Sequence, residues 1–173
     1  MLRPHLIFAI VSMALTTLPL PAATTAPLGL TRLRPQSPRL AALLARGRHR
    51  SATMRALTDR VEDGDVVVYV ETSFRIERDV VACVTWMATV PDARYLRVSL
   101  RPNLREAEAI AMLAHELQHV VEVIDHPEVT SPDALAALYA RIGHRSSSTG
   151  LNWDTQAALR AGAAARQEIV RSA

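Results

Sequence analysis

The residues of this chain best suited to chemistry lie in the segment His115-Glu116-Leu117-Gln118-His119. On a helix, residues four positions apart share one face, with Cβ atoms about 5–6 Å apart. Two imidazoles in that arrangement can reach one metal ion at about 2.0–2.1 Å, the usual Zn–N distance. Glu116 would lie about 100° around the helix from His115, near the ion but not forced to coordinate it. The pattern therefore predicts zinc at His115 and His119, with Glu116 placed to take a proton from a metal-bound water.

This interpretation requires a helix, and the surrounding sequence favours one. Apolar residues recur at three- and four-residue spacing, and neither Gly nor Pro interrupts residues 104–126. Asn103, with Glu106 three positions later, fits a capping box, and Pro127 ends the segment. The alternative is that two histidines and a glutamate fall by chance on a solvated face. The apolar face of the helix, and the scarcity of His and Glu in an Ala-, Leu- and Val-rich run, favour the metal site.

Length and composition describe one globular domain. The 173 residues are enough for a single core, and 49% hydrophobic with 21% charged residues is ordinary for such a domain. The net charge is only +3, aromatic residues make up 4%, and no basic run is interleaved with aromatics, which argues against a nucleic-acid partner. Cys83 is the only cysteine, so an intrachain disulfide is excluded.

The amino-terminal segment has the pattern of an export signal. Arg3 supplies a positive start, residues 6–18 form an apolar core, and small residues and prolines follow, so residues 1–23 are expected to be a signal peptide. The alternative is a buried or membrane-anchoring helix, although the run is short for a membrane span. Residues 24–36, rich in Pro and Thr, are expected to be a flexible leader before a domain at 37–173. We therefore expect a secreted or periplasmic protein, with no stable membrane span after signal cleavage.

The remaining pattern predicts an α+β fold. Ser37-Pro38 and Ser131-Pro132 fit an N-cap followed by proline at the first helical position, and Gly47 is the expected break between two early helices. Strands are expected at 66–70, 80–90 and 95–100, and further helices at 134–142 and 153–170. The short turn between the second and third strands favours an antiparallel pair. We expect a small sheet of about three strands packed on helices.

On the motif residues His115, Glu116 and His119, the helix that carries them and the strands before it, the chain resembles the zincin metallopeptidases. Residues 37–170 follow the element order of a compact gluzincin. The resemblance implies a Zn²⁺ cofactor, a third protein ligand from a later helix, and Glu116 as general base. It also implies a peptide or protein substrate, hydrolysed by Glu-assisted attack of zinc-bound water. The competing expectation is a zincin-like metal- or peptide-binding protein with little or no hydrolysis.

The third zinc ligand has several candidates. Asp154 stands near the start of the last expected helix, where gluzincins place a Glu, although an acid there could instead favour the helix dipole. Glu122 is the rival, but it lies about 10 Å along the helix axis from His115 and suits a bond to an imidazole N–H or an Arg better. His144 is a weaker candidate from a loop. We take Asp154 as the expected ligand.

The cleft of such an enzyme needs an edge against which a substrate can lie. The strand at 95–100 directly precedes the motif helix and is expected to form that edge, where an extended peptide could add as another strand. Tyr95, Tyr139 and His144 are possible donors to the oxyanion, and the sequence favours none of them. Neither oligomeric state nor cleavage preference follows from the residues.

Overall fold

The computed structural model describes residues 31–76, 80–145 and 153–172. The elements in chain order are β1 (Leu33–Pro35), α1 (Pro38–Arg50), α2 (Ala52–Glu62), β2 (Val66–Thr72), β3 (Ala82–Val90), β4 (Ala93–Leu100), α3 (Glu106–Ile124), α4 (Pro132–Ile142), β5 (His144–Arg145), β6 (Trp153–Asp154) and α5 (Gln156–Arg171). Helices and a small mixed sheet confirm the α+β class. None of the helices in the described part of the chain is both long and apolar enough to cross a membrane.

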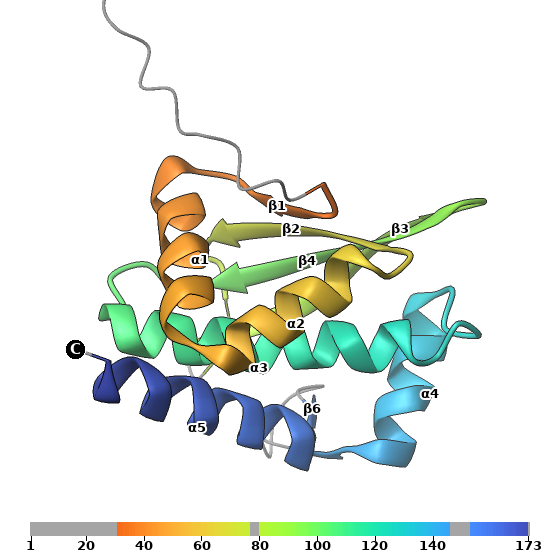
Figure 1. Cartoon of the computed structure of the whole chain (residues 1–173). Helices are drawn as coiled ribbons and strands as arrows, with labels where there is room; N and C mark the ends of the chain where they lie inside the picture. Colours follow the sequence, from red (N-terminus) through yellow and green to blue (C-terminus); the bar gives the residue numbers. More distant parts are fainter. Residues whose placement is uncertain (1–30, 77–79, 146–152, 173) are drawn as a thin grey trace, which may run out of the picture.

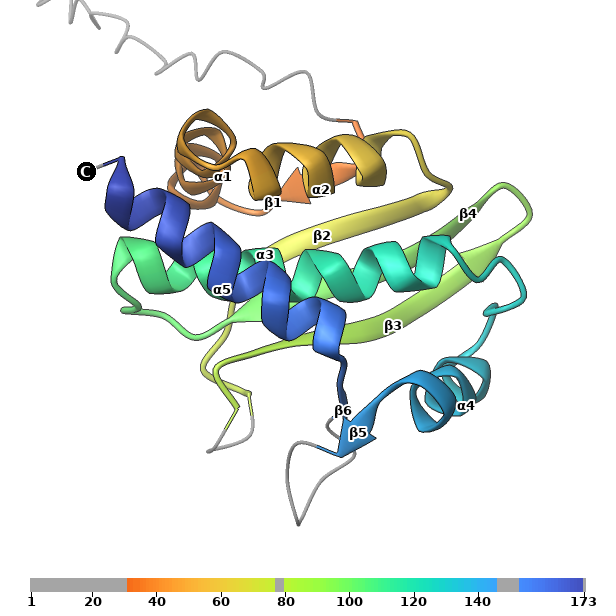
Figure 2. The same ribbon diagram turned by 60° about the horizontal axis from the view of Figure 1, so that its bottom comes forward.

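The main sheet has four strands in the order β1-β2-β4-β3. β1 and β4 run parallel to β2, whereas β3 is antiparallel to β4, as the short turn between them predicted. α3 lies along one face of the sheet, and α5 crosses the outer side of α3 (Figures 1 and 2). The apolar residues that fill the space between sheet and helices include Val68, Leu96, Val98, Leu113 and Leu117. α3 is thus the middle layer, packed on both sides.

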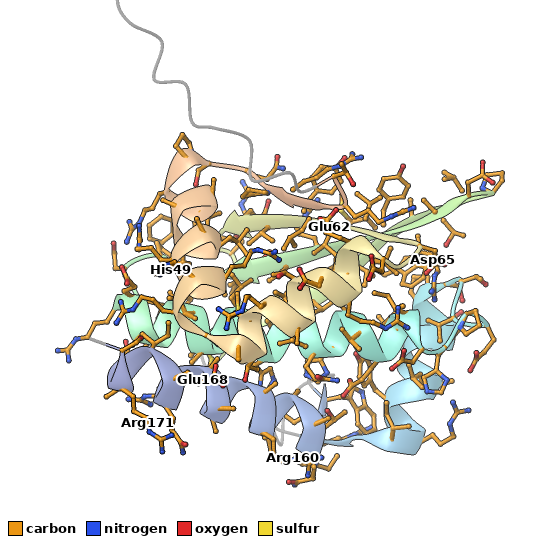
Figure 3. All side chains as sticks on the ribbon, in the orientation of Figure 1. His49, Glu62, Asp65, Arg160, Glu168 and Arg171 are labelled. Atoms are coloured by element: carbon orange, nitrogen blue, oxygen red, sulfur yellow. The ribbon has the colours of Figure 1, made fainter. Side chains whose placement is uncertain are left out.

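The fourth strand is β1, in a segment expected to be a flexible leader. Leu33 is only 1% exposed and pairs with Val68 of β2. The Glu62 carboxylate accepts hydrogen bonds from the backbone N–H groups of residues 31, 32 and 33, and Figure 3 shows Glu62 at the end of α2, near β1. The leader assignment is therefore wrong for residues 31–36, and residues 24–30 lie outside the described part. A strand of three residues ending in Pro is too short to show a period.

Serine caps begin the early helices and α4. The Oγ atoms of Ser37 and Ser131 accept bonds from N–H groups three residues later, which confirms both predicted caps. The break between α1 and α2 falls at Ser51, which caps α2, and not at Gly47. Gly47 lies within α1. Its lack of a side chain leaves room for Met54, whose Cε would lie 3.2 Å from an added Cβ.

α3 is helical as predicted but begins later than expected. Asn103 has φ 67° and therefore cannot be the N-cap, which is a position with extended backbone. Arg105 takes that position instead, and its N–H donates to the Glu108 carboxylate at 3.3 Å. The capping pair is thus shifted by two residues. Asp125 ends the helix two residues before Pro127.

The last helix also begins later than expected. Thr155 is its N-cap, while Trp153 and Asp154 form β6, paired antiparallel with β5. Asn152, the predicted cap, lies outside the described residues. Asp154 consequently precedes the helix and is not an acid of its first turn. The alternative that assigned it there, as a partner of the helix dipole, is wrong.

The edge strand of the sheet differs from the expected one. The strand expected to border the cleft corresponds to β4, but β4 has β2 on one side and β3 on the other. Its backbone groups are occupied by both neighbours, so no further strand can add there. Within the described residues the free edge on this side of the sheet belongs to β3. The short hairpin that follows β3 folds β4 inward beside β2, a nonlocal pairing that the local pattern does not reveal.

Candidate metal centre

Three residues of α3 meet at its contact with α5. The Nε2 atoms of His115 and His119 are 3.2 Å apart, so one helical turn brings both imidazoles to one point, as the spacing predicted. Glu116 lies between them in sequence and is 5% exposed, and His119 is equally buried. The His115 side chain is 13% exposed and forms, with Asp154 at 21%, the accessible side of the cluster.

Asp154 completes the group from β6. Its Oδ1 lies 2.8 Å from His115 Nε2 and 3.9 Å from His119 Nε2. Two atoms bound to one tetrahedral zinc ion lie about 3.3–3.4 Å apart, given bonds of about 2.0–2.1 Å. The three observed separations lie on either side of that value. Among the described residues, His115, His119 and Asp154 form the group that could hold a metal ion.

The two rival ligands lie elsewhere. Glu122 contacts the opposite side of the His119 ring, with its Oε2 2.8 Å from Nδ1, which confirms the predicted bond to an imidazole. His144 is exposed on β5, where its backbone pairs with that of Asp154. Neither belongs to the metal-binding group found among the described residues.

The possible oxyanion donors are engaged or distant. The Tyr139 hydroxyl donates a hydrogen bond to the backbone carbonyl of His119 at 3.1 Å, and the Tyr139 ring packs edge-on against the His119 ring. Tyr95 lies on the sheet, where its ring stacks with that of Tyr69. Tyr139 therefore supports the His119 backbone, and no donor to a reacting carbonyl is assigned to it.

Two glycines lie in close contact with the residues of the site, Gly143 with Asp154 and Gly162 with His115, and neither was predicted as part of it. A Cβ on Gly162 of α5 would lie 3.1 Å from the Ala111 carbonyl oxygen and 3.3 Å from His115 Cβ. A Cβ on Gly143 would lie 2.9 Å from the Asp154 carbonyl oxygen. At Gly143 a Cβ would clash with backbone, whereas at Gly162 it would fit only if the neighbouring backbone moved by a few tenths of an ångström. The available signal was a lone Gly in the Ala-rich last helix, a position where Ala is otherwise preferred.

Burial and close charges shift the ionisation of the cluster. Burial raises the pKa of Glu116 above its ordinary value, although the neighbouring imidazoles act in the opposite direction. Burial alone would lower the pKa of His119, but hydrogen bonds to Asp154 and Glu122 outweigh it and raise the pKa to about 9. Hydrogen bonds from His115 and His119 hold the pKa of Asp154 well below its usual range. The cluster thus keeps an ionised ligand beside a buried carboxyl that holds its proton more readily.

Comparisons with known proteins do not assign a function, so a functional assignment rests on the residues of the site. No family model, curated protein or solved structure matches the chain. Fold and site together define an α+β domain with a His-His-Asp group and a buried glutamate beside it.

Proposed function

We propose that this chain is an exported, zinc-dependent metallopeptidase with a zincin-like fold. The observation that carries the proposal is the convergence of Asp154 with His115 and His119, two residues that are 35 or more positions away from it in sequence. If the HExxH pattern had arisen by chance on a solvated helix, a third potential ligand would not be expected beside it. Glu116, beside both histidines, supplies the proton acceptor that hydrolysis needs.

The donor set suits zinc. Two imidazole nitrogens and one carboxylate oxygen are ligands that zinc accepts, and three protein ligands leave a position open, as catalytic zinc sites do. Asp154 is ionised at neutral pH because its pKa is lowered, so it would offset part of the charge of the ion. The exposed side of Asp154 and His115 faces outward, which gives the ion and a water molecule a way in.

The chemistry that zinc supplies when bound is Lewis acidity, which lowers the pKa of water toward neutral and polarises a carbonyl. Glu116 would take the proton from the attacking water and pass it to the leaving amine. Burial supports this role, because a raised pKa brings the Glu116 carboxyl closer to the pH at which it must both accept and donate. Hydrogen bonding by Glu122 would keep the His119 ring in place during these steps.

A peptide substrate would lie along β3. The outer edge of β3 has no strand partner in the described part of the chain, and α3 packs beneath β3 and β4. An extended peptide can bind to such an edge through its backbone N–H and C=O groups. The export signal at residues 1–23 lies outside the described residues, so secretion or a periplasmic location remains part of the proposal.

A second candidate function is metal or peptide binding without hydrolysis. The observation that favours it is the depth of Glu116 and His119, each 5% exposed. A base so deeply buried would reach only a substrate that enters the site from the side of Asp154.

Metal analysis and one isosteric variant separate the two functions. We expect the full-length protein to bind about one zinc per chain, measured by mass spectrometry after dialysis, and to cleave fluorescently labelled casein. Glu116→Gln should keep the zinc and lose roughly 10²–10⁴-fold in cleavage rate. Asp154→Asn should lower zinc content. Glu108→Gln, in the first turn of the same helix, is the matched control and should change neither property.

The outcomes differ for each reading. A protein that binds zinc but cleaves no casein, with Glu116→Gln equally inert, is a binder. A wild-type protein without zinc after exposure to the ion would overturn the peptidase and the metal-binding function alike. Cleavage that survives in the Glu116→Gln variant would show that the glutamate is not the base.

A further inference from the structure

We propose that Glu122 is the positioning residue of the metal centre and holds both of its halves, an inference that rests on the proposed zinc site. One half is His119 on α3, and the other is Asp154 on β6. These lie 35 positions apart, and the described residues between them include the end of α3, the whole of α4, β5 and the turns around them. A side chain that contacts both halves can set their separation.

The two carboxylate oxygens of Glu122 have different partners. Oε2 lies 2.8 Å from Nδ1 of His119, and Oε1 accepts a hydrogen bond from the Thr155 hydroxyl at 2.5 Å. Glu122, His119 and Thr155 are 9%, 5% and 4% exposed, so water competes little for these bonds. Buried hydrogen bonds to an ionised group are short and stronger than neutral ones. Glu122 therefore joins α3 to the start of α5.

The bond to His119 fixes the role of each ring nitrogen. When Glu122 is a carboxylate it can only accept hydrogen bonds, and Nδ1 of His119, which faces it, then carries the proton. In the neutral ring the lone pair then lies on Nε2, the atom that faces His115 and Asp154. Carboxylate–histidine pairs of this kind orient ligands in metal sites.

The bond to Thr155 acts on the other half of the site. The Thr155 hydroxyl gives its proton to Glu122 and accepts a bond from the Ala158 N–H at 3.1 Å, which caps α5. Asp154 directly precedes Thr155, so its backbone cannot move far while this hydroxyl is held. Because one peptide bond joins Asp154 to Thr155, Glu122 also restricts the position of Asp154, the proposed third ligand.

An acid at position 122 can accept both bonds at once. Glutamine has the same shape but only one acceptor oxygen, and its NH₂ group would face a donor, either the ring N–H or the hydroxyl. The chain contains a matched pair outside the site, because Glu128 contacts Nδ1 of the partly exposed His126 at 3.0 Å. Glu128 therefore serves as the control for a His–Glu contact that holds no ligand.

The test measures zinc affinity of the full chain by competition with a chromophoric chelator. We expect Glu122→Gln to weaken Zn²⁺ binding about 10–100-fold, the usual effect of losing a group that supports a metal ligand. Glu128→Gln should leave the affinity unchanged. Thr155→Val should weaken binding, whereas Thr155→Ser, which retains the hydroxyl, should restore it.

A double-mutant cycle separates positioning from a general effect of charge. If Glu122 acts through Thr155, the losses in Glu122→Gln and Thr155→Val overlap, and the double variant loses less than their sum. Simple additivity would show that the effect of Glu122 on the site does not run through Thr155, and would overturn its role in joining the two halves. The Nδ1 proton of His119, observed by NMR in the zinc-loaded protein, should shift upfield in Glu122→Gln and stay in place in Glu128→Gln.

Failure of this inference is distinct from failure of the proposed function. Unchanged zinc affinity and an unchanged ring proton in Glu122→Gln would overturn the positioning role and leave the zinc site standing. A wild-type chain that binds no zinc would overturn both. If Glu122→Gln does not fold, the comparison of Thr155→Val with Thr155→Ser decides the matter by the same readouts.

Discussion

Replacing Gly162 by alanine tests whether the close approach of α5 to α3 sets the metal site. α5 presents Ala158, Ala161 and Ala165 to its buried side, and Gly162 lies at the point nearest His115. An added Cβ would meet the carbonyl oxygen of Ala111 at 3.1 Å. Relief requires one helix to move by a few tenths of an ångström, because a helical carbonyl cannot swing away by itself.

Two opposing terms decide the change in stability. Alanine is favoured over glycine in a helix by about 1 kcal/mol, whereas overpacking a core costs about 1–3 kcal/mol. The net result should lie between about zero and 2 kcal/mol of destabilisation. The metal site is affected more directly, because Asp154, whose Oδ1 lies 2.8 Å from His115 Nε2, directly precedes the N-cap of α5 and would move with that helix. We expect zinc affinity to fall by about tenfold, the lower end of the effect of losing ligand support.

Urea denaturation and chelator competition measure the two quantities separately. Ala163→Gly is the matched control, because Ala163 is exposed on the same helix and reports the propensity difference alone. It should cost about 1 kcal/mol and leave zinc affinity unchanged. If Gly162→Ala instead gains the full 1 kcal/mol and binds zinc normally, the distance between α3 and α5 does not limit the site, and the reasoning is refuted.

Two further predictions concern ionisation. In the metal-free protein, the pKa of His119 is raised from 6.5 to about 9, so its stabilising effect is fully present below pH 6.5 and is lost as the pH rises through 9. Urea denaturation in chelator should show a loss of up to about 3 kcal/mol across that interval, absent in His119→Gln, at about 1.4 kcal/mol per pKa unit. Arg94→Met should cost about 1–3 kcal/mol in the same assay, because the buried guanidinium donates to the Val123 and Val129 carbonyls, which lose this donor, whereas its partner Asp65 is half exposed and stays hydrated. Arg141→Met, which breaks an exposed ion pair, should cost under about 1 kcal/mol.

The helix of the motif could be predicted because its signal is long and local. Nineteen residues carry an apolar stripe, and the spacing of His115 and His119 then fixes their shared face. The start of the helix could not be predicted to the residue. Asn103 is a good cap, but it also tolerates the left-handed backbone that the turn after β4 requires, and the turn prevails.

For Asp154, the location near the histidines could be expected, but the local backbone could not. Resemblance to a family placed the candidate third ligand, Asp154, near the start of the last helix, and the structure brings its carboxylate to the histidines. Its local backbone was predicted wrongly because Asn152 and Thr155 are both favoured caps, and propensity does not choose between them. The hydrogen bond from Thr155 to Glu122 favours the later start. That contact joins residues 33 positions apart, so no window of sequence contains it.

In the sheet, too, the local pairing could be predicted from the sequence and the nonlocal pairing could not. The β3–β4 hairpin follows from two strands separated by a short turn, and its antiparallel pairing was predicted. The parallel pairing of β1 with β2 depends on α1 and α2, which connect the two strands, and the parallel pairing of β2 with β4 passes over β3 in the sequence. Without that information, the order of the strands stays open, and the free edge was assigned to β4 instead of β3.

Three buried or half-buried glutamates explain how a small domain without a disulfide holds its parts in register. Glu62 gathers the N–H groups that begin β1, and Glu122 joins His119 to the start of α5. Glu168 reaches from the far end of α5 to Ser51 and the N–H of Thr53 at the start of α2, as Figure 3 shows by its place between the two helices. α5 is therefore fixed at both ends by carboxylates that each accept several donors. Hydrogen bonds lower the pKa of Glu62 and Glu168 despite their partial burial. The stabilisation from these two carboxylates is therefore present above pH 4.5, and it is lost as the pH falls through the lowered pKa values. Acid should therefore loosen the position of α5, and with it that of Asp154, the proposed third ligand.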